Sequence, residues 1–397
     1  MDAARAMGTF LRTWRAEWAG LSQAQLAVAV SAHCGGTHRI EKYTIGEWEK
    51  GQAPHSTAEL EALLGVMRRH GITETEAGDF RQAVFAACCS RHYPELFADT
   101  GTAHSEDVDG LAYELHRREE AAPGATSIVD LVALQSELEQ AVTGEEALQA
   151  GRTQRCRQHT ALAWVRSVLG RRHWRHASRP AQAARVFSSN CDSLAAQFGP
   201  RGLPPDLSVL GQRSCQVYAE LQAAGVAGRP DEARGRARAL LGLYREAWEA
   251  RDFPAAIHSL FLAVYPHGLP SDEAVHVLRE GQRHSMSHPE VGMPVPYRHA
   301  ALCACATAVG LFAPAERHLA VFGELGTGDP DGRALGHTLT GHLARSRGDA
   351  REAQTSFEGA LQLAVERADP EAARAARASL EALDRRPGPG GTPSFGR

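Results

Sequence analysis

The side chains with the greatest capacity for chemistry in this chain stand together in residues 39–51, Arg-Ile-Glu-Lys-Tyr-Thr-Ile-Gly-Glu-Trp-Glu-Lys-Gly. Lys42 and Lys50 are the only two lysines of the chain, against 41 arginines. Ammonium, phenol and carboxylate groups in one short segment bind charged or hydrogen-bonding partners. No nucleophile with a neighbouring base accompanies them, so the segment indicates recognition rather than catalysis.

The spacing within this segment predicts a short helix with one buried face. Ile40, Ile45 and Trp48 are apolar and are predicted to lie in the core, and Gly51 is a C-terminal stop. The other positions are polar or small and are predicted to face outward: Lys42, Tyr43, Gly46, Glu47 and Lys50.

A second short helix is predicted just upstream. Ser22 can cap a helix that runs to about Ala32, with Leu26 and Ala27 facing inward. Two such helices, one displayed by the other, form the helix-turn-helix that reads DNA. Thirteen residues separate Ala27 from Glu41, several more than a minimal turn needs. Either the second helix is extended, or a small loop lies beside the DNA-facing helix.

Three further helices complete a five-helix domain over residues 1–95, which we call the head. Residues 7–20 place Arg12 and Arg15 opposite a face of four apolar side chains, Met7, Leu11, Trp14 and Trp18. A fourth helix follows Pro54, with a Ser56 cap and an acidic residue three positions later. Residues 77–90 predict the fifth helix.

The motifs at residues 21–27, Leu-Ser-Gln-x-x-Leu-Ala, and 44–51, Thr-Ile-x-x-Trp-Glu-x-Gly, resemble the phage-repressor-like (XRE-type) helix-turn-helix family over about residues 8–70. The resemblance implies that Gln23 contacts a phosphate and that the reading helix touches base edges. The predicted base-contacting residues are Lys42, Tyr43 and Glu47, and the DNA-binding set is completed by Arg39, Thr44 and Lys50. The long turn departs from the family pattern. The alternative is a helical hairpin that binds protein instead of DNA.

The charge of the head favours a dimer. Residues 1–55 carry six basic and five acidic side chains, a net of +1. Because neutralisation of phosphates drives DNA binding, a single copy is predicted to bind weakly. We therefore expect a homodimer on a palindromic site in double-stranded DNA.

Two neighbouring segments carry opposite charge. Residues 101–150 hold eleven acidic and two basic side chains, whereas residues 151–185 hold nine arginines and no acid. The basic segment could be a second anion-binding surface. We favour the simpler interpretation that the two segments neutralise each other as packed helices.

An internal period begins after residue 170. Five alanines follow turn-like residues at intervals of 50, 41, 41 and 38: Ala183, Ala233, Ala274, Ala315 and Ala353. Four positions after each stands a large residue or alanine: Phe187, Ala237, Leu278, Leu319 and Phe357. Small residues at fixed positions let paired helices approach closely. This pattern resembles degenerate tetratricopeptide repeats, which stack as helical hairpins into an α-solenoid with a concave binding surface.

The predicted fold is therefore all-α. We expect a helix-turn-helix domain over residues 1–95, a connector over 96–126, a tetratricopeptide-like repeat domain over 127–385 and a disordered tail over 386–397.

Residue types that bind metals or catalyse reactions lack the required spacing. His284 and His288 stand four residues apart, but no glutamate lies between them and Pro289 follows. The pairs Cys88-Cys89 and Cys303-Ala-Cys305 lack the gap of a zinc site and are predicted to be small buried residues of helices. No phosphate-binding glycine loop or nucleophile elbow is present. We expect no enzyme activity, no cofactor and no metal.

Composition indicates a cytoplasmic protein. The eight cysteines are sparse, as in reduced proteins, and no stretch has the length of a signal peptide core or a membrane helix. The formal net charge of −4 argues against a general polyanion binder.

A head of this type followed by helical repeats resembles two groups of bacterial regulators. One is the peptide-pheromone receptors, which often clamp a peptide with asparagines, whereas Asn190 is the single asparagine of this chain. The other is the actinobacterial regulators with tetratricopeptide tails, which fit the composition better. The resemblance implies a DNA-binding transcriptional regulator whose repeat domain dimerises or senses a peptide, small molecule or protein. The alternative is a protein-interaction adaptor whose helix-turn-helix does not read DNA.

Overall fold

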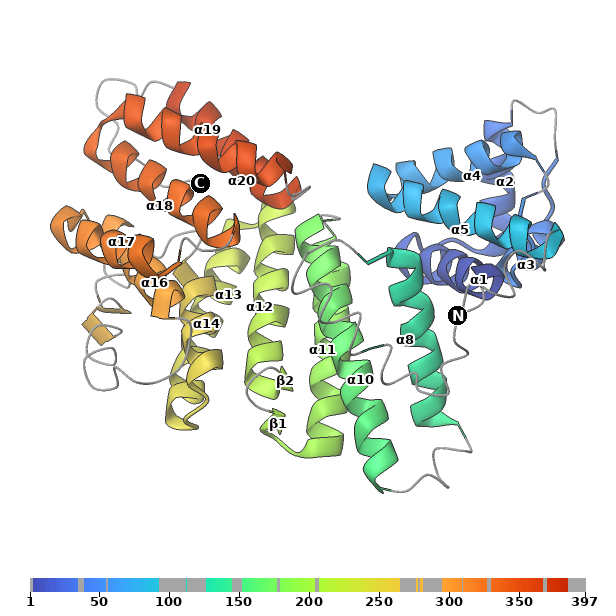
Figure 1. Cartoon of the computed structure of the whole chain (residues 1–397), viewed down its shortest axis with the longest axis horizontal. Helices are drawn as coiled ribbons and strands as arrows, with labels where there is room; N and C mark the ends of the chain where they lie inside the picture. Colours follow the sequence, from blue (N-terminus) through green and yellow to red (C-terminus); the bar gives the residue numbers. More distant parts are fainter. Residues whose placement is uncertain are drawn as a thin grey trace. The chain divides into compact units, whose positions relative to one another are not determined.

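The computed structural model describes residues 3–34, 39–54, 56–92, 112, 126–144, 152–176, 179–203, 207–264, 276–277, 279–280, 295–308, 310–326, 330–366 and 370–384. The chain forms two compact units, Met1–Arg172 and His173–Arg397. Figure 1 shows that both are built almost entirely from helices. The predicted all-α class is confirmed.

The first unit contains these helices: α1 (Ala3–Thr13), the π-helical turn η1 (Trp14–Trp18), α2 (Gln23–His33), α3 (Lys42–Glu49), α4 (Thr57–Arg69), α5 (Glu74–His92), α8 (Ile128–Thr143) and α10 (Arg152–Arg171). The five helices predicted for the head therefore all form, with ends shifted by a few residues. The second helix ends at His33, and Arg39 to Glu41 lead directly into α3. Residues 35–38 of the long turn lie outside the described residues.

The helix caps of the head follow the predicted residues. The Ser22 side chain accepts from the backbone N–H of Gln25, and Gln25 accepts in turn from the backbone of Ser22. Ser56 accepts from the backbone N–H of Glu59 at 3.2 Å. Each bond satisfies a helix N–H that has no partner within its own helix, which fixes where α2 and α4 begin.

The head has a continuous apolar core. The predicted core residues Met7, Leu11 and Trp14 are buried, whereas Trp18 is only half-buried. The rings of Phe10 and Phe80 lie 5.6 Å apart and join α1 to α5. This burial of large side chains supplies most of the stabilisation of α1, α2, α4 and α5.

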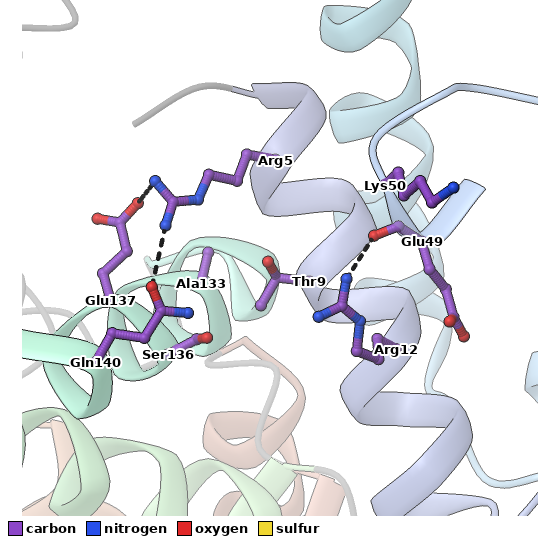
Figure 2. Close-up of a pocket in the computed structure, with 9 residues that line it drawn as sticks. All are labelled: Arg5, Thr9, Arg12, Glu49, Lys50, Ala133, Ser136, Glu137 and Gln140. Atoms are coloured by element: carbon purple, nitrogen blue, oxygen red, sulfur yellow. Dashed lines mark hydrogen bonds and ion pairs between the residues drawn. The ribbon is translucent and has the colours of Figure 1, made fainter. Parts of the chain in front are cut away.

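Helices α8 and α10 belong to the same compact unit as the head. Helix α8 packs against α1 and α5, and α10 packs against α8. Figure 2 shows Arg5 of α1 reaching Glu137 and Gln140 of α8. The compact unit thus extends to Arg172, whereas the sequence placed a boundary at residue 95 and began the repeat domain at residue 127. Apart from Ala112 and Thr126, the predicted connector lies outside the described residues, as does the predicted tail.

Polar contacts attach α8 and α10 to the head. Asp79 of α5 accepts from the backbone N–H of Ile128, the first residue of α8, at 3.1 Å. The buried Arg172 donates to the carbonyl oxygen of Thr126 at 3.1 Å. Arg166 of α10 and Glu139 of α8 form an ion pair at 2.9 Å. This pair joins the basic and acidic segments, in line with their mutual neutralisation.

The second unit begins with η2 (Arg172–His176), which starts at the last residue of the first. Its further elements are α11 (Pro180–Phe198), β1 (Gly202–Leu203), β2 (Leu207–Ser208), α12 (Val209–Val226), α13 (Pro230–Glu249), α14 (Phe253–Val264), α16 (Val295–Ala308), α17 (Phe312–Gly326), α18 (Pro330–Arg347), α19 (Ala350–Glu366) and α20 (Pro370–Asp384). Within the described residues, strand structure is limited to β1 and β2, an antiparallel pair with Gly202 opposite Ser208.

Three pairs of consecutive helices in this unit are joined by the same turn. Gly228, Gly310 and Gly348 each follow a helix with positive φ, which an L side chain adopts only with strain. In each turn the residue after the glycine donates its N–H to a carbonyl five residues back. The next helix then begins, and its fourth residue is one of the predicted alanines: Ala233, Ala315 or Ala353. The helix pairs α12–α13, α16–α17 and α18–α19 are therefore built on the same plan.

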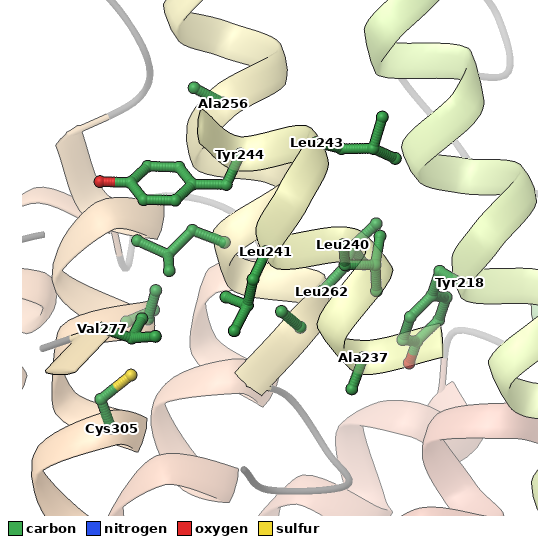
Figure 3. Close-up of a cluster of buried hydrophobic side chains, with 14 of the residues drawn as sticks. Tyr218, Ala237, Leu240, Leu241, Leu243, Tyr244, Ala256, Leu262, Val277 and Cys305 are labelled. Carbon is green, nitrogen blue, oxygen red and sulfur yellow. The ribbon is translucent and has the colours of Figure 1, made fainter. Parts of the chain in front are cut away.

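The core of the second unit runs through successive helices. Figure 3 shows Tyr218 of α12, Leu241 of α13, Leu262 of α14 and Cys305 of α16 gathered in one buried cluster. The predicted helix-facing residues Phe187 and Phe357 are fully buried. Cys303 and Cys305 are buried too, as predicted for small core residues. The copy of the pattern at Ala274 and Leu278 lies outside the described residues.

One further turn of the same kind was not evident from the sequence. Between α13 and α14 the left-handed position is taken by Arg251, with φ of 58°. The following residue, Asp252, again donates its N–H to a carbonyl five residues back, that of Ala247. The fourth residue of α14 is Ala256. Because arginine stands where the other turns have glycine, the period is hidden in the sequence.

Arg251→Gly should stabilise the protein by about 1 kcal/mol, because glycine adopts positive φ without the steric cost of a Cβ atom. Gly348→Arg is the reciprocal change and should destabilise it by a similar amount. No atom lies within 4 Å of a Cβ built at Gly348, so that change tests backbone conformation alone. Urea unfolding of the full chain measures both, and equal midpoints for Arg251→Gly and wild type would contradict the argument.

His342 gives the second unit a pH-dependent stability. Its ring lies 5.1 Å from that of Phe357. Burial, together with the charge of Arg345, lowers the pKa of His342 to about 4. In the unfolded chain the His342 imidazole has an ordinary pKa of about 6.5. As the pH falls below that value, the unfolded chain therefore binds a proton that the folded chain does not. The free energy of unfolding is therefore unaffected by this group above about pH 6.5. It decreases as the pH falls toward 4, by about 2 kcal/mol at pH 5.

Urea unfolding at pH 7 and pH 5 tests this expectation. Wild type should lose more stability between the two pH values than His342→Gln, because glutamine does not titrate. His276→Gln is the matched control, since the His276 side chain is 66% exposed. Equal losses for wild type and His342→Gln would show that the imidazole is accessible to protons in the folded state.

None of the helices in the described part of the chain combines the length and apolarity needed to cross a bilayer.

Candidate nucleic-acid interface on the third helix

Helix α3 is held against the head by its apolar face. Ile40, Ile45 and Trp48 are buried, with exposed fractions of 6%, 0% and 1%. This confirms the predicted buried face of the helix. Gly51 follows at φ of 98°, so the predicted stop also forms. A Cβ atom at Gly51 would stand 2.7 Å from the carbonyl oxygen of Ala4, so glycine also permits the close approach of α1.

A hydroxyl group of α2 fixes where α3 begins. Ser31 accepts from the backbone N–H of Ile40 at 2.8 Å and lies 3.2 Å from the carbonyl oxygen of the same residue. It also lies 2.8 Å from the carbonyl oxygen of Ala27. This role of Ser31 is not evident from the sequence. Ser31 and Ile40 lie on opposite sides of the long turn, so their spacing along the chain does not predict the contact.

The start of α3 presents side chains to solvent. Arg39, Lys42 and Tyr43 are exposed, with Tyr43 at 73%. Thr44 is half-buried. A guanidinium, an ammonium and a phenol in adjacent turns can bond phosphate oxygens and base edges. The structure thus brings three of the predicted residues to one exposed end of the helix.

The end of α3 carries charges that are already paired. Glu47 accepts from Lys50 Nζ at 2.7 Å and from Gln52 Nε2 at 2.6 Å. The bond to Glu47 raises the pKa of Lys50. Glu47 and Lys50 therefore present a largely neutral pair, and their predicted contacts with DNA would require exchange of these partners.

Glu49 is the buried polar centre of the site. Its side chain is 4% exposed and forms an ion pair with Arg15 of η1. Gln23 Nε2 donates to the second carboxylate oxygen at 2.7 Å, and Arg12 donates to the Glu49 carbonyl oxygen at 3.1 Å. The Glu49 network, comprising Arg12, Arg15, Gln23 and Glu49, thus ties α1, η1, α2 and α3 together. One N–H of Gln23 is used within the head, and its predicted phosphate contact remains a prediction.

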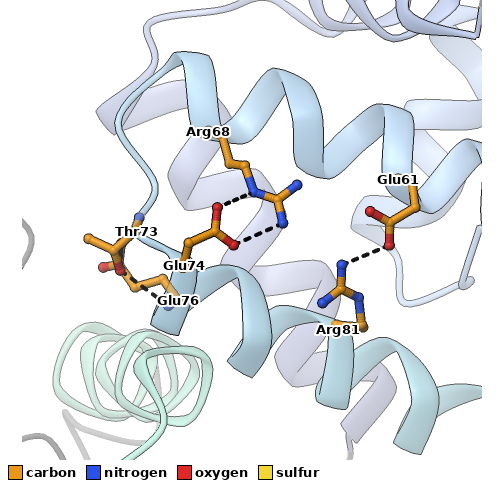
Figure 4. A network of polar contacts seen from close by, with 6 residues as sticks. All are labelled: Glu61, Arg68, Thr73, Glu74, Glu76 and Arg81. Carbon is orange, nitrogen blue, oxygen red and sulfur yellow. Dashed lines mark hydrogen bonds and ion pairs between the residues drawn. The ribbon is translucent and has the colours of Figure 1, made fainter. Parts of the chain in front are cut away.

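Other ion pairs of the head differ from the Glu49 network in their exposure. Figure 4 shows Arg68 with Glu74 and Arg81 with Glu61, both on the surface of α4 and α5. The Arg81 and Glu61 side chains are 46% and 47% exposed. Water screens such pairs, so each contributes little to the stability of the head.

Within the described part of the chain, no cluster of three or more histidine, cysteine, aspartate or glutamate side chains could hold a metal ion. His284 and His288 lie outside that part. No protein-family model matches this chain, and no curated protein or solved structure matches it significantly.

Proposed function

We propose that this chain is a cytoplasmic DNA-binding transcriptional regulator that reads DNA with α3. The observation that carries the proposal is the contrast within this one helix. Arg39, Lys42 and Tyr43 are exposed at its start, while Ile45 and Trp48 hold it against the head. A rigidly held helix with polar groups at its exposed N-terminal end has the properties that major-groove recognition requires.

Selection of bound sequences from a random duplex library with the full chain tests this proposal. A single enriched motif, bound in a gel shift and lost when its bases are changed, is the expected result. Recovery of no motif, with binding that follows only the salt concentration, would overturn it. That outcome would favour a protein-interaction adaptor, whose exposed α3 binds a polypeptide.

We propose further that the second unit is a tetratricopeptide-like solenoid that senses a peptide, metabolite or protein. The recurring turns and the alanine at the fourth position of the following helix support this proposal. The asparagine clamp of pheromone receptors is disfavoured, because Asn190 is fully buried and its amide donates to Gln212 at 2.9 Å. Ligand binding would shift the population of the spacing between two heads.

The full chain should be a dimer in light scattering and should bind its operator ~10²–10⁴-fold more tightly than a monomeric head. The reason is the net charge of +1 on residues 1–55, which gives one head little affinity. The fragment for comparison is residues 1–172, because a fragment ending at residue 95 would uncover the α1 surface on which α8 packs. Equal affinities for a monomeric fragment and the full chain would contradict dimeric binding.

A further inference from the structure

A polar recess of about 150 Å³ lies within the first unit, between α1, the end of α3 and α8 (Figure 2). Arg5, Thr9 and Arg12 follow one face of α1, at spacings of four and three residues. Ser136, Glu137 and Gln140 follow the facing side of α8. Helices α1 and α8 of the first unit therefore leave a hydrophilic space between them at this point.

Hydrogen-bond donors dominate the walls of the recess. Arg5 donates to the Oε1 atom of Gln140 at 3.3 Å, which turns the Gln140 amide nitrogen toward the space. Arg12 uses one N–H for the carbonyl oxygen of Glu49, and a guanidinium has five. Thr9 lies between the two arginines in Figure 2, and Ser136 adds a second hydroxyl group from α8. These groups suit a ligand that offers several acceptor atoms.

The groups that face the recess carry a net positive charge, because the arginines outnumber the carboxylates. Glu49 lines it but directs its carboxylate to Arg15 and Gln23, outside the space. Glu137 is the remaining acid, 3.5 Å from Arg5, whose side chain is 57% exposed. Two guanidinium groups thus face one carboxylate, and Lys50, which also lines the recess, pairs with Glu47. An oxyanion matches this charge and donor set better than a cation does.

The recess is separate from the proposed reading surface. Lys42 begins α3 and Glu49 ends it, so the two places lie at opposite ends of an eight-residue helix about 12 Å long. The recess also requires α8, which the reading surface does not. A volume of about 150 Å³ exceeds the ~30 Å³ share of one water several-fold, which leaves room for a phosphate-sized group.

We propose that this recess binds the phosphate group of a small phosphorylated molecule. Arg5 and Arg12 hold the phosphate oxygens from α1, and Ser136 and Gln140 bond them from α8. A bound phosphate then bridges the two helices and holds α8 on the head. This binding does not depend on DNA recognition.

Isothermal titration calorimetry of the full chain in a phosphate-free buffer of constant ionic strength tests the proposal. The probes are inorganic phosphate and glycerol 3-phosphate, with chloride as the reference anion. We expect saturable binding of one phosphate per chain and a matching rise in the melting temperature. Arg12→Gln and Arg5→Gln, both on the α1 wall of the recess, should each weaken binding at least tenfold, and Ser136→Ala on α8 should weaken it less.

Two further variants sharpen the result. Glu137→Gln should strengthen phosphate binding several-fold, because it removes the one carboxylate that faces the ligand. Arg81→Gln is the control, since it removes an exposed arginine of the head away from the recess. Binding that never saturates, or that Arg5→Gln and Arg12→Gln leave unchanged, would overturn the proposal. Loss of DNA binding in these variants with phosphate affinity unchanged would instead assign the arginines to the DNA backbone.

Discussion

Replacement of Glu49 by alanine should destabilise the first unit by about 3–5 kcal/mol. The Glu49 side chain is 4% exposed, and its carboxylate is the shared acceptor for Arg15 and Gln23. Its removal leaves the Arg15 guanidinium without its ionic partner, and the Arg15 side chain is only 13% exposed to water. A buried charge that has lost its partner costs more than the intact pair contributes, so the effect exceeds that of a surface pair.

Thermal and urea unfolding of the full chain, followed by helical circular dichroism, measure this loss. Glu61→Ala is the matched control, because it removes a carboxylate from the exposed pair with Arg81 and should cost less than about 1 kcal/mol. The double change Arg15→Met with Glu49→Leu should be less destabilising than Glu49→Ala alone, since no buried charge is left unpaired. Equal stability of Glu49→Ala and wild type would show that water enters this site.

Local signals predicted the elements of the head well. The caps at Ser22 and Ser56, the stop at Gly51 and the buried pair Ile45 and Trp48 all act within one helix or at its ends. Such features depend on residues a few positions apart, so spacing along the chain reveals them.

The Glu49 network was not predicted, because its partners are far apart in the sequence. Arg15 and Glu49 are separated by 34 residues, and Gln23 and Glu49 by 26. Arg12 and Arg15 were assigned to the face of the first helix opposite its apolar side chains, which is correct for the helix alone. Both side chains contact Glu49 at the end of α3, and the periodicity of a single helix does not predict such a contact.

The place of α8 also escaped prediction for a physical reason. Its buried residues include Leu131, Leu134 and Leu138, which would suit a core in either unit. Apolar periodicity shows that a helix is buried but not which neighbour covers it. The backbone N–H of Ile128 at the start of α8 donates to the Asp79 carboxylate, and this hydrogen bond joins residues 49 positions apart.

The double substitution Lys42→Ala with Tyr43→Ala should weaken binding to the selected DNA motif by roughly 10²-fold or more. Each side chain can contribute about 1–3 kcal/mol through a base or phosphate contact, and both stand exposed at the start of α3. Folding should be unaffected, because neither side chain belongs to the buried face. A plot of the logarithm of affinity against the logarithm of salt concentration should also become less steep by about one, as expected for one lost phosphate contact.

Lys50→Ala is the control that separates base reading from general attraction to DNA. The Lys50 side chain is 68% exposed, but its ammonium already pairs with Glu47, so its loss should change affinity only a few-fold and selectivity not at all. Gel shifts with the selected motif and with a scrambled duplex measure both quantities, and circular dichroism confirms folding. If the Lys42 and Tyr43 variant keeps normal affinity and selectivity, α3 does not enter the groove. The reading surface would then have to lie on another part of the first unit.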